Sequence, residues 1–179
     1  MKRSALRRKL KEKAGFTLAE LLMAVLILLM VSSIVAMGIP VAVNAYYKVV
    51  DASNAQILLS TTITRLRSEL AYVTAVKTDS SNAVLNFTNG YKLEMFCDDE
   101  GIKTQTAGKT DSQLLVPSAL TNSLKMKKAF VAKYDGNITF DGQVFTITNL
   151  QITKDGNVVA GPITKLEIRP ITNVKIEKD

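Results

Sequence analysis

The sequence predicts an α+β protein, in which one long N-terminal helix packs on an antiparallel β-sheet head. Residues 21–43 contain no charged side chain, and residues 45–73 continue with apolar positions at helical spacing. From residue 83 onward the apolar period falls toward two, and Asn-Gly and Asp-Gly pairs separate short β-like runs. The change of period is what a helix followed by a sheet produces.

Charge is distributed very unevenly along the chain. The net charge is +7, but residues 1–15 alone hold seven Lys or Arg and one Glu, so the rest of the chain is nearly neutral. A groove for a polyanion needs clustered bases on the folded part, so we expect no nucleic-acid contact by the head. The excess charge belongs to a short N-terminal leader.

The chain has no histidine and a single cysteine, which limits the catalytic, metal and disulfide sites that it can form. Without histidine, the commonest general base, the usual catalytic triads and most zinc sites are excluded. One cysteine, Cys97, excludes an internal disulfide. We therefore expect no enzyme activity, no cofactor and no resident metal.

The apolar segment is long enough to cross a membrane. A helix over residues 21–43 would span about 34 Å, against a hydrocarbon layer of about 30 Å. The basic leader favours a cytoplasmic N-terminus and a head outside the plasma membrane. A secretory signal peptide is the alternative: its apolar region is usually shorter, but the small residues around Ala45 leave a cleavage site possible.

Glu20 lies at the mouth of this apolar run. With Thr17 it fits the S/T-x-x-E capping box, in which each side chain satisfies a free amide at the helix start. A carboxylate next to hydrocarbon also predicts a cationic partner, and no Lys or Arg lies between Glu20 and Lys48. The cation must come from another molecule or from a new N-terminus.

Residues 15–29, GFTLAELLMAVLILL, resemble the N-terminal signature of type IV prepilins and pseudopilins. The resemblance implies cleavage by a prepilin peptidase between Gly15 and Phe16 and N-methylation of Phe16. It also implies an assembly role for Glu20, which would meet the terminal amine of a neighbouring subunit. The partners implied are the peptidase, other pilin or pseudopilin subunits, and membrane lipid before assembly.

Two features of the helix beyond the signature carry expectations. Gly38 and Pro40 predict a bend or a melted turn near the outer end of the apolar run. Beyond it, a stripe of heptad type is expected to lie on the head, with a coiled coil as the alternative. The positions of this stripe are Ala45, Val49, Ala52, Gln56, Leu59, Ile63, Leu66, Leu70 and Val73.

The head is expected to form a sheet of about five to seven strands. Residues 77–82 should break the helix, and Asn89-Gly90 should turn a hairpin. Residues 98–113 look like a polar loop, and residues 118–125 like a short turn or helix. Further turns are expected at Asp135-Gly136, Asp141-Gly142 and Asp155-Gly156.

Two motifs in the head imitate functional sites. Residues 101–110 resemble a phosphate-binding loop, but six residues separate the two glycines where four are needed. Asp98, Asp99 and Glu100 offer oxygen ligands for calcium, but consecutive acids suit a polar turn better than a site of 6–8 spaced ligands. Cys97 is interpreted as a half-buried strand residue.

The expected organisation has four parts: a leader over residues 1–15 that is removed, a transmembrane and assembly helix over 16–43, an amphipathic continuation over 44–76, and a head over 77–179. The first functional hypothesis is a structural subunit, a minor pilin or pseudopilin, assembled into a type IV pilus, a type II secretion filament or a DNA-uptake filament. The alternative is a membrane-anchored or secreted binding module that does not assemble.

Overall fold

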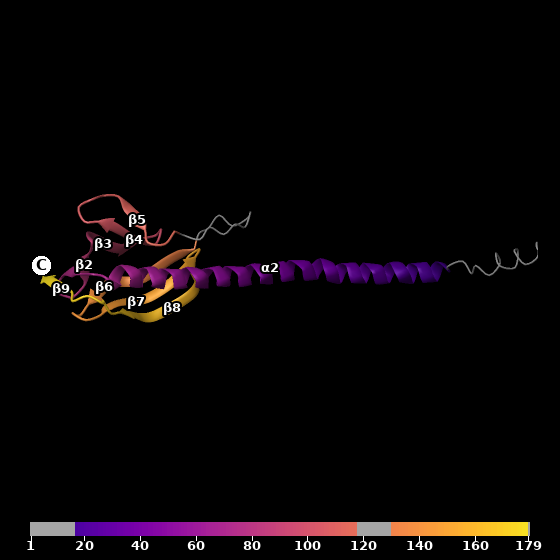
Figure 1. The fold of residues 1–179 in the computed structure, drawn as a ribbon. Coiled ribbons are helices and arrows are strands. Elements are labelled where there is room, and N and C mark those ends of the chain that lie inside the picture. The colour runs from indigo at the N-terminus through magenta and orange to yellow at the C-terminus, as the bar shows by residue number, and fades with distance from the viewer. Residues whose placement is uncertain (1–16, 118–129, 179) are drawn as a thin grey trace, which may run out of the picture. The chain divides into compact units, whose positions relative to one another are not determined.

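The computed structural model describes residues 17–117 and 130–178, and it has an α+β fold. One helix, α2 (Leu18–Ala71), precedes nine strands in the described part of the chain (Figure 1). The chain divides into two compact units at Tyr47 and Lys48. The expected long helix and antiparallel-dominated sheet head are confirmed.

The N-terminal unit consists of the first part of α2. Every residue from Leu18 to Val49 is exposed, and the helix continues without interruption through Gly38 and Pro40. The melted turn expected there is therefore wrong. Proline removes one N–H donor, and the hydrogen bonds of the neighbouring turns keep the helix continuous.

The second part of α2 packs its apolar face on the head. The fully buried helix residues are Ala55, Leu58, Thr62, Leu66 and Leu70. Only Leu66 and Leu70 of the expected stripe are in this set; Leu59 and Ile63 are half-buried at its side, and Gln56 is exposed. The buried positions advance by three, four, four and four residues, so they drift away from a strict seven-residue repeat, as the face of a helix without supercoil does. The heptad register was therefore wrong for the earlier turns.

The helix ends at Ala71, five residues before the predicted limit at residue 76. The Ala71 carbonyl accepts a hydrogen bond from the Ile171 amide at 2.8 Å, and the Val73 carbonyl accepts one from the Thr172 hydroxyl. The connection between the last two strands thus satisfies carbonyls that the helix end leaves free. Strand β1 (Ala75–Thr78) follows at once.

The first sheet has six strands in the order β5-β4-β3-β2-β1-β9. All neighbours are antiparallel except β1 and β9, which are parallel. The predicted hairpin at Asn89-Gly90 is confirmed, and Gly90 has a φ of 71°. The bounds of the remaining strands are β2 (Val84–Asn89), β3 (Tyr91–Cys97), β4 (Ile102–Thr106), β5 (Ser112–Leu114) and β9 (Lys175–Lys178).

The polar loop predicted for residues 98–113 is wrong, because β4 and the start of β5 lie within it. These strands are half-buried or exposed apart from Ile102, so their side chains show no apolar alternation. The segment that resembled a phosphate-binding loop is largely strand β4. The turn expected over residues 118–125 lies outside the described residues.

The second sheet has three strands in the order β6-β7-β8: β6 (Val131–Phe140), β7 (Phe145–Lys154) and β8 (Asn157–Ile168). Turns at Asp141-Gly142 and Asp155-Gly156 join them, as predicted. Asp135-Gly136 is no turn but an irregularity inside β6, where the register on β7 shifts. The described residues therefore hold nine strands in two sheets, against the five to seven expected in one.

Both sheets and α2 share one hydrophobic core. Among its members, Phe140 and Phe145 stack with ring centroids 4.4 Å apart, on either side of the β6–β7 turn. Figure 1 shows the C-terminal part of α2 between β3–β5 and β6–β8. The sheets meet where Ala83 bridges to Thr139, and the Phe140 amide donates to the Asn82 carbonyl at 2.9 Å.

Candidate functional site: the helix start and the head pocket

The start of α2 forms the predicted capping box. The Thr17 amide and hydroxyl donate to Glu20 Oε2 at 2.9 and 3.0 Å, and the Glu20 amide donates to Thr17 Oγ1 at 3.2 Å. The Thr17 carbonyl accepts the first helical bond, from the Leu21 amide at 3.1 Å. Thr17 is therefore the N-cap residue, and Glu20 reaches back to it from the third helical position.

The capping box occupies one oxygen of the carboxylate and brings no cation to it. The first base after Glu20 in the sequence is Lys48, 28 residues further along the same helix, which corresponds to about 42 Å. Within one chain, Glu20 therefore has a cap partner but no charge partner from the following part of α2. The structure confirms that Glu20 takes part in a capping box. Its pairing with the terminal amine of another subunit stays a prediction.

The residues around Glu20 make α2 a candidate membrane span by length and composition. The most apolar part of the helix has a mean hydropathy of 2.7 and none of it is buried in the protein. Gly15 and Phe16, the predicted cleavage and methylation residues, lie outside the described residues. Their processing stays a prediction.

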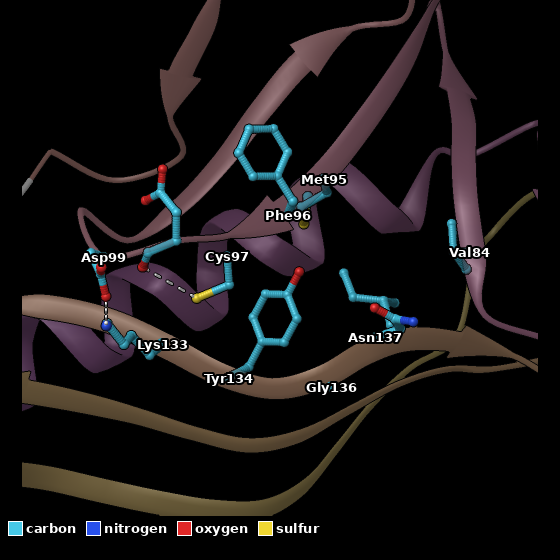
Figure 2. Close-up of a pocket in the computed structure, with 11 residues that line it drawn as sticks. Val84, Met95, Phe96, Cys97, Asp99, Lys133, Tyr134, Gly136 and Asn137 are labelled. Carbon is cyan, nitrogen blue, oxygen red and sulfur yellow. Dashed lines mark hydrogen bonds and ion pairs between the residues drawn. The ribbon is translucent and has the colours of Figure 1, made fainter.

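The head has a pocket of about 500 Å³ between β3 and β6, with Val84 of β2 at one side (Figure 2). Strand β2 pairs with β3 only as far as Leu93, so the two strands diverge beyond it and leave this space. Lys133 and Asp99 form an ion pair of 3.0 Å at its rim.

Cys97 and Tyr134 line this pocket, and both are held in their neutral forms. Burial raises the pKa of the Cys97 thiol above its usual value. Burial, with the nearby Cys97, also raises the pKa of the Tyr134 hydroxyl well above its usual range. A thiol kept protonated is a poor nucleophile, and the thiol is half-buried as predicted.

The three consecutive acids form a turn held by lysines. Asp98 accepts the amides of Glu100 and Gly101 at 2.9 and 3.1 Å. Lys103 pairs with Asp98 at 2.7 Å and with Glu100 at 2.5 Å, and its bond to Asp98 lowers the pKa of that carboxyl. Within the described residues, no group of three or more Cys, Asp or Glu is placed to hold a metal ion.

One polar contact was not predicted from the sequence. Lys154 of β7 lies 2.6 Å from Asp51 of α2, with the two side chains 9% and 21% exposed. The partners are 103 residues apart. No local pattern announces such a pair, because each residue alone looks like an ordinary surface charge.

Comparison with known families gives one match. A family model described as the prokaryotic N-terminal methylation motif matches residues 10–36. The chain therefore carries a type IV prepilin-like signature, as the sequence indicated, and the motif marks a type IV pilin-like precursor. The family that this motif defines is structural, and the motif implies processing by a prepilin peptidase and assembly with other pilins. No curated protein and no solved structure matches the chain.

Proposed function

We propose that this chain is a minor pilin or pseudopilin, a structural subunit of a type IV pilus, a type II secretion filament or a DNA-uptake filament. The observation that carries the proposal is the methylation motif over residues 10–36, which overlaps the start of α2, a helix whose apolar surface is exposed from Leu18 to Val49. An apolar surface of that length needs lipid or other apolar helices around it. A pilin subunit uses both, lipid before assembly and neighbouring helices after it.

In this proposal, each part of the chain has its own role. Residues 1–15 form a cytoplasmic leader that prepilin peptidase removes, and residues 16–43 form the transmembrane and assembly helix. The helix continues on the head as far as Ala71. The basic leader keeps the N-terminus in the cytoplasm and leaves the head outside the plasma membrane.

Cleavage between Gly15 and Phe16 supplies the cation that Glu20 lacks. It creates a terminal amine, N-methylated on Phe16, and it removes six units of net positive charge from the leader end. The amine of an adjacent subunit then pairs with Glu20 within the apolar helix bundle. A buried pair of this kind sets the register between subunits, because one charge alone would be left without a partner in an apolar surrounding.

The proposal is tested by determining the mature N-terminus. The chain is purified from membranes of its native cell and its N-terminal peptide is analysed by mass spectrometry. N-methyl-Phe16 is expected, and a Gly15→Leu variant should keep the leader, since the peptidase has to accommodate the residue before the cut. A matched Ala14→Leu variant, one position further away, controls for leader damage.

The same measurement separates the alternative. An intact Met1 in a strain with active peptidase would indicate a plain membrane anchor and would contradict the proposal. A chain beginning at Tyr46 would indicate a secreted head.

A further inference from the structure

In the ion pair between Asp51 and Lys154, the lysine is buried and the aspartate is half-buried. Lys154 Nζ lies 2.6 Å from Asp51 Oδ2, and it also lies over the ring of Phe130, 4.9 Å from the centroid. Phe130 is itself completely buried. The ammonium is thus held between a carboxylate and an aromatic face, at a position that water barely reaches.

The pair lies where the head first covers the helix. Residues of α2 are exposed up to Val49, whereas Val50 and Asp51 are half-buried. Ala55, one turn later, is the first fully buried residue of the helix. Lys154 is the last residue of β7, immediately before the Asp155-Gly156 turn, so its position is fixed by the sheet.

Where the head first covers α2, small side chains make much of the buried contact. The first buried residues, Ala55, Leu58 and Thr62, include two small side chains, and burial of apolar surface has no preferred direction. An ion pair forms only where the helix brings its carboxylate next to the ammonium. Asp51 is the only acidic residue between Glu20 and Glu69, so no neighbouring turn of α2 offers Lys154 a second carboxylate.

We propose that Asp51 and Lys154 form a register clasp, which fixes the axial position and the rotation of α2 on the head. A slip by one turn would move Asp51 by about 5.4 Å and leave a buried ammonium without this carboxylate. A buried ion pair contributes little net stability compared with well-packed apolar residues, because both charges lose their hydration. Its contribution here is to the choice of register.

The experiment separates register from stability by replacing both partners. The full chain is studied in detergent micelles with Cys97→Ser and with spin labels at Ser53 and Val158, which are exposed on α2 and β8. Electron resonance gives the distance distribution between the labels, and chemical denaturation gives the unfolding midpoint. The variants are Asp51→Leu, Lys154→Met, and both together.

Loss of the Asp51 carboxylate beside Lys154 in Asp51→Leu should lower the unfolding midpoint. The double variant should recover that midpoint, yet its label distances should broaden or show a second population displaced by about 5 Å, one helical turn. A double variant with a single narrow, unchanged distance would overturn the proposal, and so would an Asp51→Leu variant with unchanged midpoint and distances. The control replaces the exposed Lys165–Glu167 pair with Met and Leu, which should alter neither readout.

A variant with exchanged charges keeps the inference testable if the double variant does not fold. In Asp51→Lys with Lys154→Asp, the pair is restored in reverse, so a narrow distance distribution at the original value is expected. A folded charge-exchanged chain with broad distances would overturn the clasp.

Discussion

Replacing Glu20 with leucine should separate helix capping from filament assembly. In the isolated chain the substitution removes the acceptor of two Thr17 hydrogen bonds, at 2.9 and 3.0 Å. Loss of a cap costs about 0.5–2 kcal/mol. That cost falls on the first turn of a helix of 54 residues, so the rest of α2 and the head should be unaffected. Membrane insertion should be preserved, because the change makes the segment more apolar.

The effect on assembly should be much larger. In the proposed filament, Glu20 neutralises the Phe16 amine of an adjacent subunit, and removing one partner of a buried pair costs about 3–5 kcal/mol. This corresponds to a loss of roughly two to four orders of magnitude in subunit association. Glu20→Leu should therefore reach normal membrane levels and nearly disappear from sheared filaments.

Thr17→Ala is the matched control. It removes the same cap from the other side but keeps the carboxylate, so it should cost about 1 kcal/mol and leave incorporation close to normal. Both variants are first checked for a mature N-terminus at Phe16, and their membrane levels are compared. Equal losses in the two variants, or normal incorporation of Glu20→Leu, would show that the acid is only a helix cap.

Three further predictions concern the head, each measured on the full chain in detergent. Leu66→Ala should lower the free energy of unfolding by about 2–5 kcal/mol because Leu66 is completely buried, whereas Ile57→Ala at an exposed site should change it by less than about 0.5 kcal/mol; similar values for both would refute the packing of α2. Gly161→Ala should destabilise the protein more than Gly156→Ala. Both glycines have positive φ, but only at Gly161 would a Cβ lie 2.8 Å from a backbone oxygen. Equal effects of the two substitutions would contradict this backbone contact. Cys97 should react slowly with iodoacetamide at neutral pH and faster only above the usual thiol pKa, since its raised pKa keeps it protonated; unfolding in urea should accelerate the reaction, and rapid labelling of the folded chain would refute this.

Features that depend on short-range patterns could be predicted from the sequence. A run of apolar residues long enough for a membrane, a capping box at Thr17 and Glu20, and the methylation motif are each contained in a single short stretch of consecutive residues. The hairpin at Asn89-Gly90 was equally local, because a residue with positive φ in the turn selects glycine. Such features do not need the rest of the chain to be recognised.

The wrong secondary-structure predictions fall on segments whose residue types suit either a turn or a strand. Asp135-Gly136 has the composition of a turn but forms an irregularity within β6, where Thr148 and Asn149 of β7 bond to Asp135. Strand β4 was read as a loop because, apart from Ile102, its side chains are polar and half-exposed. Neighbouring strands supply the hydrogen bonds that make these segments β-structure, and those neighbours are not adjacent in the sequence.

Only the tertiary structure decided how the helix is seated on the head. The sequence predicted a stripe through Leu59 and Ile63, whereas the structure buries Leu58 and Thr62, one position earlier on the helix. Local spacing cannot choose between these two neighbouring faces. The sheets chose the second face, whose positions follow the pitch of a helix without supercoil. They also brought Lys154 to Asp51 across 103 residues. Burial and charge pairing depend on two surfaces in contact. Local sequence patterns predict the apolar or charged character of each surface, but they do not predict which distant segment it will contact.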